Sequence, residues 1–289
     1  MTAVESNFVS VIIPVYNDWG RLASCIECLK NQSFQSDCFE IIVVDNGSTS
    51  TSQGFGIFGE HVTILVEESK GSYAARNCGL ERAKGDIVAF TDSDCLPDKD
   101  WLKNGVAELT KIGRKGMVAG KIEVFSKYRN KPTSVELYDS VFGFDQKRYM
   151  LDSHYGATAN MMVWREAFSE IGVFDKALYS GGDKQWGLRA WKAGYDQVYV
   201  EGAVVEHPAR RTLREHLVKV KRVTHGKMDI ASGPNGKALL SESKMYTMRE
   251  KFSYICSCLK RLRWHEKIRV LYVLGLTQVY KVRIYTSTS

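Results

Sequence analysis

Apolar and polar positions alternate along the first third of the chain in a way that predicts strands and helices in turn. Four apolar runs rich in β-branched residues are typical of buried strands: Phe8–Val15, Phe39–Asp45, His61–Val66 and Asp86–Thr91. Arg21–Gln32 and Tyr73–Lys84 lie between them and have apolar residues at helical spacing. This β-α-β-α-β order predicts an α/β fold with a doubly wound, mostly parallel sheet and helices on both faces.

The rest of the chain changes from mixed to helical. Met117–Phe125, Tyr155–Trp164 and Ala203–Glu206 have strand patterns, and Asp183–Ala193 has a helical pattern that ends before Gly194. Beyond Pro208, Thr212 and Glu215 have the spacing of a capping box, which predicts a helix start. Gly233–Gly236 predicts a turn, and two further helices are expected over 242–263 and 265–284.

Charge divides the chain of 289 residues, which has a net charge of +7, into two unlike parts. Pro208–Ser289 has 18 basic and 5 acidic residues, a net charge of +13. The preceding residues have 22 basic against 28 acidic, a net charge of −6. We therefore expect a catalytic or binding domain over 1–209 and a basic helical extension over 210–289.

The basic extension predicts an anionic partner. We expect no nucleic acid as partner, because the chain has no helix-turn-helix, zinc-finger spacing or ribonucleoprotein motif. Residues 249–285 interleave basic with aromatic and aliphatic residues, which favours an anionic membrane surface. The alternative is that these apolar residues pack on the protein itself.

Several absences in the sequence favour a cytoplasmic location, peripheral on the inner face of a membrane if the extension binds lipid. The N-terminus lacks a signal-peptide pattern, and no apolar stretch reaches the length of a membrane span. The seven cysteines are an odd number without a disulfide-framework spacing, and Cys25 and Cys28 have no second pair at zinc spacing.

Polar clusters follow three of the predicted strands, at Pro14–Asn17, Asp45–Ser48 and Asp92–Asp94. Ligands of doubly wound sheets bind at the carboxyl ends of the strands, so these clusters are expected to converge. Asp92 and Asp94, two residues apart, can present oxygen ligands to Mg²⁺ or Mn²⁺. The alternative is a solvated turn.

Three other residues have both a structural and a functional interpretation. Asp45 can form an Asx-turn with the following Asn-Gly-Ser, or it can accept hydrogen bonds from a nucleotide base. His207 is a structural histidine or a metal ligand. Asp183 is a helix N-cap or a residue that faces a ligand, since the preceding glycines let the backbone approach one closely.

Taken together, the motifs resemble the inverting family 2 glycosyltransferases of the GT-A fold over Val9–Pro208. The segments that carry the resemblance are VSVIIPVYN, IIVVDNGSTS, GSYAARNCGLERAKGDIVAFTDSDCLPDKDWL, GATANMMVWREAFSEIGVFD, GGDKQWGLRAWKAGY and VVEHPAR. The resemblance implies a metal-dependent inverting transfer of a sugar from a nucleoside-diphosphate sugar to a hydroxyl acceptor, in polysaccharide or glycolipid biosynthesis. UDP is the nucleotide it favours, with GDP and dTDP as alternatives, and the acceptor would be a glycan or lipid-linked.

The resemblance also implies roles for individual residues. Asp94 and His207 would bind Mn²⁺ or Mg²⁺, and Asp183 would be the catalytic base. Asp92 would contact the ribose or a water beside the metal. The other donor-side residues it implies are Pro14, Tyr16, Asn17, Asp45 and Arg76, of which Arg76 would orient the aspartates or the diphosphate.

The acceptor side departs from the family pattern. Gly182 stands where the family often has a Glu before the catalytic base. How the acceptor would be bound is therefore left open by the resemblance. Asn160 and Trp186 are expected on the acceptor side, although Trp186 could equally be a core residue. A catalytically silent nucleotide-sugar- or lipid-binding module is the alternative to an enzyme.

Overall fold

A computed structural model describes residues 7–49 and 62–287 of the chain. His61 of the third expected strand and Ser50 of the second motif lie outside these residues. The chain forms two compact units. The first comprises Met1–Ile122 and Gln146–Glu206, and the second comprises Glu123–Asp145 and His207–Ser289.

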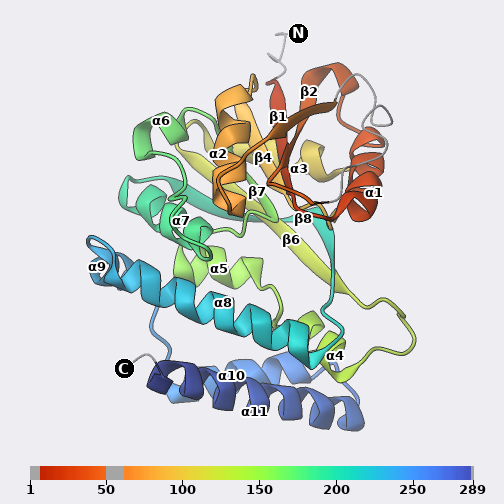
Figure 1. Ribbon diagram of the computed structural model, residues 1–289, viewed down its shortest axis with the longest axis vertical. Helices are drawn as coiled ribbons and strands as arrows, with labels where there is room; N and C mark the ends of the chain where they lie inside the picture. Colours follow the sequence, from red (N-terminus) through yellow and green to blue (C-terminus); the bar gives the residue numbers. More distant parts are fainter. Residues whose placement is uncertain (1–6, 50–61, 288–289) are drawn as a thin grey trace. The chain divides into compact units, whose positions relative to one another are not determined.

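A mixed, mostly parallel sheet forms the centre of the first unit (Figure 1). Its strands in the described residues are β1 Val9–Val15, β2 Phe39–Asp45, β3 Val62–Val66, β4 Ile87–Thr91, β5 Leu96–Pro97, β6 Gly116–Phe125, β7 Asn160–Trp164 and β8 Asp196–Pro208. They are ordered β3-β2-β1-β4-β7-β6-β8-β5. β3, β2, β1 and β4 are parallel, whereas β7 is antiparallel to both β4 and β6. The predicted fold class is confirmed.

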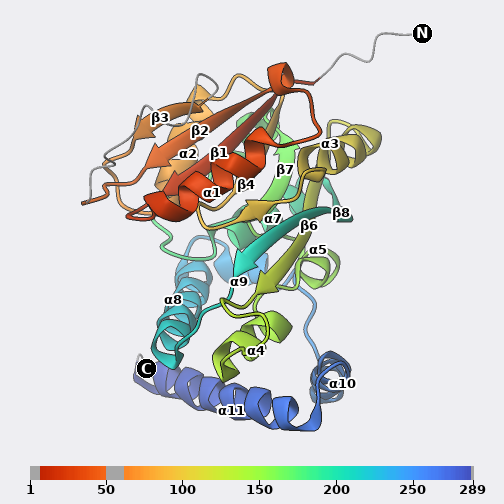
Figure 2. The same ribbon diagram turned by 90° about the vertical axis from the view of Figure 1, so that its right-hand side faces the viewer.

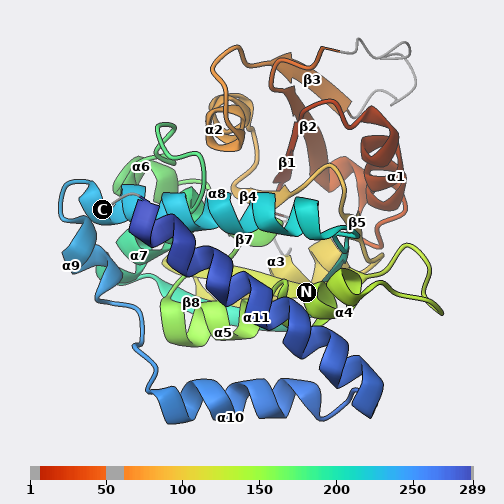
Figure 3. The same cartoon turned by 60° about the horizontal axis from the view of Figure 1, so that its bottom comes forward.

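Helices cover both faces of this sheet. Those of the first unit are α1 Trp19–Lys30, α2 Ser72–Arg82, α3 Trp101–Ile112, α5 Gln146–Ser153, α6 Ala167–Ile171 and α7 Gly182–Lys192, with a short 3₁₀ helix, η1, at Ser36–Cys38. α1 and α2 lie on opposite faces of β1 and β2 (Figure 3). Ile12 of β1 packs with Ala75 and Leu80 of α2 in one core cluster. This two-sided burial explains why the strands have no polar face.

Several elements differ from the pattern in the sequence, among them β8 and α3. β8 begins at Asp196, well before the expected Ala203, and α3 was not predicted at all. Polar residues and Gly202 interrupt the apolar pattern of β8, so only pairing within the sheet reveals its length. α3 is amphipathic, with Trp101, Leu102 and Leu109 on its buried side.

The second unit is helical outside the ends of β6 and β8. Its helices in the described residues are α4 Ser134–Phe142, α8 Leu213–Ser232, α9 Gly236–Leu240, α10 Met248–Leu259 and α11 Trp264–Ser287. The predicted capping box is present at the start of α8, where Thr212 Oγ1 accepts from the Glu215 amide. Thr133 and Thr247 cap α4 and α10 in the same way.

α11 packs against α4 and α8 within this unit (Figure 2). Val270 and Val273 of α11 share a core cluster with Tyr138 of α4. The Thr277 hydroxyl of α11 lies 2.8 Å from Nε2 of His216 in α8. One face of α11 therefore packs on its own unit. Within the described part of the chain, no helix combines the length and the apolar character that crossing a membrane requires.

Candidate active site

The loops after β1 and β2 are joined at the carboxyl edge of the sheet. The Asn17 amide donates to Ser48 Oγ over 2.8 Å, and Asn17 Oδ1 accepts from the Thr49 amide over 2.8 Å. Asn17 adopts a left-handed φ of 52°, which asparagine tolerates better than most residues. The two loops therefore form one surface, on which Tyr16 is exposed and Pro14 partly buried.

Asp45 forms the Asx-turn that its sequence context suggests. Its Oδ1 accepts from the Ser48 amide over 3.0 Å. The side chain of the next residue, Asn46, donates to the backbone of Glu67 and Ser69 and accepts from the Gly71 amide. These bonds fix the end of β2 to the segment that leads into α2.

The turn after β4 gathers acidic side chains with a buried thiol. One ligand atom from each of Asp92, Asp94 and Cys95 lies within 4.8 Å of the others. Arg21 Nη1 of α1 is 3.3 Å from Asp94 Oδ2, and Arg21 Nε is 2.7 Å from Asp18 Oδ1. Burial and the two aspartates raise the pKa of the Cys95 thiol, so the sulfur stays protonated and the donors with negative charge are carboxylates.

The buried side chain of Arg76 contacts this turn. Its side chain is buried on α2, and Nη2 makes a short hydrogen bond to Asp92 Oδ1. Its Nε is also buried and has no hydrogen-bond partner among the described residues. A buried donor without a partner is uncommon in folded proteins and is often completed by water or a ligand.

Asp183 lies in the first turn of α7, preceded by Gly181 in a left-handed conformation with φ of 83°. Tyr73 Oη of α2 donates to Asp183 Oδ1 over 3.1 Å. Burial raises the pKa of Asp183, although hydrogen bonds from the Lys184 amide and Tyr73, together with the Arg76 charge, oppose the increase. A carboxylate with a raised pKa is a stronger proton acceptor.

Tyr73 also explains the glycine before Asp183. A Cβ placed on Gly182 would lie 2.8–2.9 Å from atoms of the Tyr73 ring. No side chain fits at position 182 while Tyr73 holds this place. The departure from the family pattern therefore comes with a tyrosine whose ring occupies that space and whose hydroxyl contacts the neighbouring carboxylate.

His207 is the residue of β8 that comes directly after its short pairing with β5. Leu96, two residues beyond Asp94, pairs with Glu206 of β8, and His207 is the next residue of β8. Its ring lies 4.8 Å from that of Phe144, and Nδ1 is 2.8 Å from the Pro208 carbonyl. A proton on Nδ1 makes this bond and leaves Nε2 as the nitrogen with a lone pair.

Comparison with protein families shows which family the chain belongs to. The model described as "Glycosyl transferase family 2" matches residues 10–172. The chain belongs to this family. A glycosyltransferase of Haloferax volcanii, AglE, is 36% identical over 228 residues, which cover 77% of this chain and 74% of AglE. The protein is therefore an enzyme of the glycosyltransferase class.

More distant relatives carry names and ligands that are informative about the family. A Methanococcus voltae relative is named dolichyl N-acetyl-α-D-glucosaminyl phosphate 3-β-D-2,3-diacetamido-2,3-dideoxy-β-D-glucuronosyltransferase. It is 25% identical over 74% of this chain and 70% of its own. A Pyrobaculum calidifontis mannosyltransferase solved with GDP-Man and Mn²⁺ has a TM-score of 0.65 at 18% identity, covering 97% of this chain and 86% of its own. TarS of S. aureus with UDP-GlcNAc has a TM-score of 0.55 at 18% identity, covering 96% and 82%.

Asn160 and Trp186, the two residues expected on the acceptor side, are both buried in this family 2 glycosyltransferase. Asn160 is buried, accepts from Trp101 Nε1 over 2.8 Å, and donates to the carbonyls of Lys121 and Ala203. Trp186 is fully buried against Phe168 and donates to the Gly172 carbonyl. Both side chains therefore have structural contacts, and their acceptor-side placement stays a prediction.

Sequence reasoning missed three residues that lie against the expected site residues. Tyr73 is one helical turn before Arg76, and that spacing places both on one face of α2. Asp18 and Arg21 begin α1 directly after the first loop, and their i,i+3 spacing was a signal for an ion pair. Their contact with the turn after β4 joins segments far apart in sequence, which no local pattern reveals.

Proposed function

We propose that the protein catalyses a metal-dependent, inverting transfer of a sugar from a nucleoside-diphosphate sugar to a hydroxyl acceptor. The observation that carries this proposal is the connected chain of side chains Asp92–Arg76–Tyr73–Asp183 in the first unit. It links a turn suited to a metal and diphosphate with a carboxylate suited to proton removal. Neighbours of the same fold were solved with GDP-Man and Mn²⁺ or with UDP-GlcNAc, which supports this type of donor.

The donor set of the acidic turn fits Mn²⁺ or Mg²⁺. Carboxylate oxygens are ligands that both ions prefer. Asp94 and His207 would hold the ion, with Asp92 beside the ribose or a water next to it. When bound, the ion would neutralise negative charge on the diphosphate.

The donor nucleotide is proposed to lie on the joined loops after β1 and β2. Pro14, Tyr16 and Asn17 would line its site, and Asp45 would face the base through the oxygen that the Asx-turn does not use. The Arg76 Nε donor would be completed by a diphosphate oxygen or by a water beside it. UDP is the proposed nucleotide, and GDP remains an alternative because the P. calidifontis neighbour was solved with GDP-Man.

Asp183 is proposed to act as the catalytic base. Its carboxylate would take the proton of the acceptor hydroxyl as the oxygen attacks the anomeric carbon and the nucleoside diphosphate leaves. Attack from the face opposite the leaving group inverts that carbon. The raised pKa of Asp183 favours proton transfer from a hydroxyl, and Tyr73 holds the carboxylate in place.

The acceptor is proposed to be a glycan or a lipid-linked sugar used in polysaccharide or glycolipid biosynthesis. The name of the M. voltae relative, which specifies a dolichyl phosphate acceptor, supports the lipid-linked class. An enzyme with such an acceptor would work at a membrane surface, so we propose a cytoplasmic protein that is peripheral on the inner face of the membrane.

The test combines donor screening with product analysis. The purified chain is mixed with Mn²⁺ and UDP-, GDP- or dTDP-sugars, and thermal unfolding is followed because a ligand of the folded state raises its apparent stability. The donor that stabilises the protein is then offered with a polyprenyl-phosphate-linked sugar, and the anomeric configuration of the product is read by NMR. Retention of configuration would refute the role of Asp183. Stabilisation by a donor without transfer or hydrolysis would indicate a silent binding module.

A further inference from the structure

α11 has apolar side chains on two opposite faces. Val270, Val273 and Ile284 lie on the face that packs on α4 and α8, and all three are buried. A second set is exposed to solvent: Trp264, Ile268, Leu271, Tyr272, Val279, Val282 and Tyr285. Trp264 is 75% exposed, Val279 71% and Tyr272 65%, so these are not the margins of the packed face.

The exposed set forms one continuous stripe, defined here as the outer face of α11. Its members recur at steps of three, four or seven residues, which place them on one side of a helix. The stripe runs from Trp264 to Tyr285 of α11 and therefore extends over about 33 Å. Scattered apolar residues on a surface are normal, but a contiguous exposed stripe of this length marks an interaction surface.

The charge around the outer face identifies the kind of partner. α10, α11 and their connection, residues 248–287, contain 9 basic and 2 acidic residues, a net charge of +7. No acidic residue follows Glu266 in α11. Exposed basic residues border the stripe near both ends, with Arg263 before Trp264 and Arg283 beside Val282. This surface is complementary to one that is both apolar and negatively charged.

We propose that the outer face of α11 binds an anionic membrane, with the helix lying in the plane of the lipid headgroups. Trp264 and Tyr272 suit that interface because each has an apolar ring and a polar group. A second copy of the chain is a poorer partner. Paired outer faces would bring Arg263, Lys267 and Arg283 of each copy against like charges, which is unfavourable.

The membrane face deepens the peripheral placement proposed above, and it can be tested without the reaction. The full chain is mixed with vesicles of phosphatidylcholine alone, or of phosphatidylcholine with phosphatidylglycerol, in the absence of nucleotide and acceptor. Failure to bind would overturn this inference and leave sugar transfer, measured with detergent-solubilised acceptor, untouched.

The expected result is strong co-sedimentation with anionic vesicles, little with neutral ones, and weakening by salt. The double variant Ile268→Ser/Val279→Ser removes two exposed aliphatic side chains that would enter the lipid, so it should bind anionic vesicles roughly tenfold more weakly. Val218→Ser is the matched control, because Val218 of α8 is 63% exposed but lies outside α11. Its binding should equal that of the wild type.

Fluorescence gives a second measurement that does not depend on the double variant folding. Trp264 emission should shift to the blue on anionic vesicles and be quenched by brominated lipid, and Trp264→Phe should remove that change. Binding of the double variant at wild-type strength would overturn the proposal. Equal binding to neutral vesicles would do the same, as would a dimer in sedimentation equilibrium that the double variant abolishes.

Discussion

Tyr73 Oη donates a hydrogen bond to Asp183 Oδ1 over 3.1 Å, and the ring of the same tyrosine fills the space beside Gly182. Tyr73 is buried on α2, where its ring also lies 5.7 Å from the Arg76 guanidinium. The position and the protonation of Asp183 therefore depend on a residue 110 positions earlier in the chain. This dependence leads to the first prediction.

Tyr73→Phe should move the acidic limb of the pH profile of kcat/KM to higher pH. The hydroxyl stabilises the ionised carboxylate, so its removal raises the pKa of Asp183 further. At a pH below that limb we expect roughly a fivefold loss of kcat/KM, the worth of about one hydrogen bond. Tyr195→Phe is the control, since Tyr195 is also buried but donates to Glu170. An acidic limb that stays in place in Tyr73→Phe would contradict the tuning role.

Asp183→Asn should lower kcat by about 10²–10⁴-fold while donor binding is retained. The amide is similar in shape and can still accept from Tyr73, but it cannot take the proton of the acceptor. Turnover is measured with saturating donor, and the donor Kd is measured by calorimetry. Turnover close to the wild type would show that another group is the base.

Chelation of divalent cations should abolish donor binding, and added Mn²⁺ should restore it. Asp94→Asn should weaken Mn²⁺-dependent donor binding by at least about tenfold, because a charged ligand of the ion is lost. Asp86→Asn is the matched control: Asp86 precedes β4, at the opposite end of the strand, and is exposed. Full donor affinity in excess chelator would remove the metal from the proposal.

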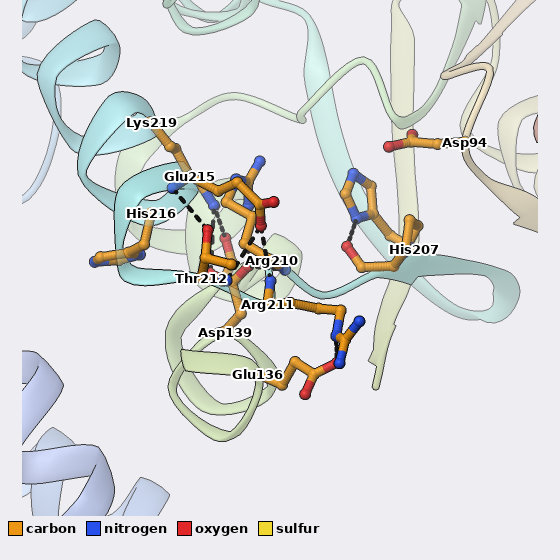
Figure 4. Close-up of polar contacts among 12 residues, drawn as sticks. Asp94, Glu136, Asp139, His207, Arg210, Arg211, Thr212, Glu215, His216 and Lys219 are labelled. Carbon is orange, nitrogen blue, oxygen red and sulfur yellow. Dashed lines mark hydrogen bonds and ion pairs between the residues drawn. The ribbon is translucent and has the colours of Figure 1, made fainter. Parts of the chain in front are cut away.

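Asp139 of α4 is predicted to stabilise the second unit through the segment that follows β8. Figure 4 shows its carboxylate among residues of this segment and of α8. Asp139 Oδ2 accepts from the Arg210 amide and from Arg210 Nη1, each over 3.0 Å, and Lys219 Nζ lies 3.9 Å from Oδ1. Burial opposes ionisation, but Lys219 and Arg210 lower the pKa of Asp139 below its ordinary value.

Asp139→Asn should therefore reduce the free energy of unfolding by roughly 2–4 kcal/mol at neutral pH, because two cations lose their buried partner. A lowered pKa contributes stability above the pKa of the unfolded state, and this stability is lost as the pH falls through the folded value. The difference between variant and wild type should accordingly shrink below about pH 4. Denaturant unfolding measures both.

The exposed Asp229 of α8 offers the control for this measurement, and Asp229→Asn should leave stability unchanged. A difference between Asp139→Asn and the wild type that does not vary with pH would show that packing, not charge, is responsible.

The sequence by itself determined the parallel half of the sheet and the position of the acidic turn. Continuous β-branched runs such as Phe39–Asp45 have no polar face, so only burial on both sides accommodates them. Asp92 and Asp94 follow such a run, and the ends of parallel strands meet at one edge. The capping box at Thr212 could also be predicted from the sequence, because its hydrogen bonds join residues only three positions apart.

Tertiary structure decided what contacts each side chain makes. An asparagine, a tryptophan and a tyrosine can each line a site or fill a core, and only packing assigns Asn160 and Trp186 to the core and Tyr73 to Asp183. Likewise, the apolar residues of α11 are evident in the sequence, but which of them are buried depends on where α4 and α8 lie. Local pattern fixes secondary structure because it depends on neighbours in the chain, whereas a site depends on neighbours in space.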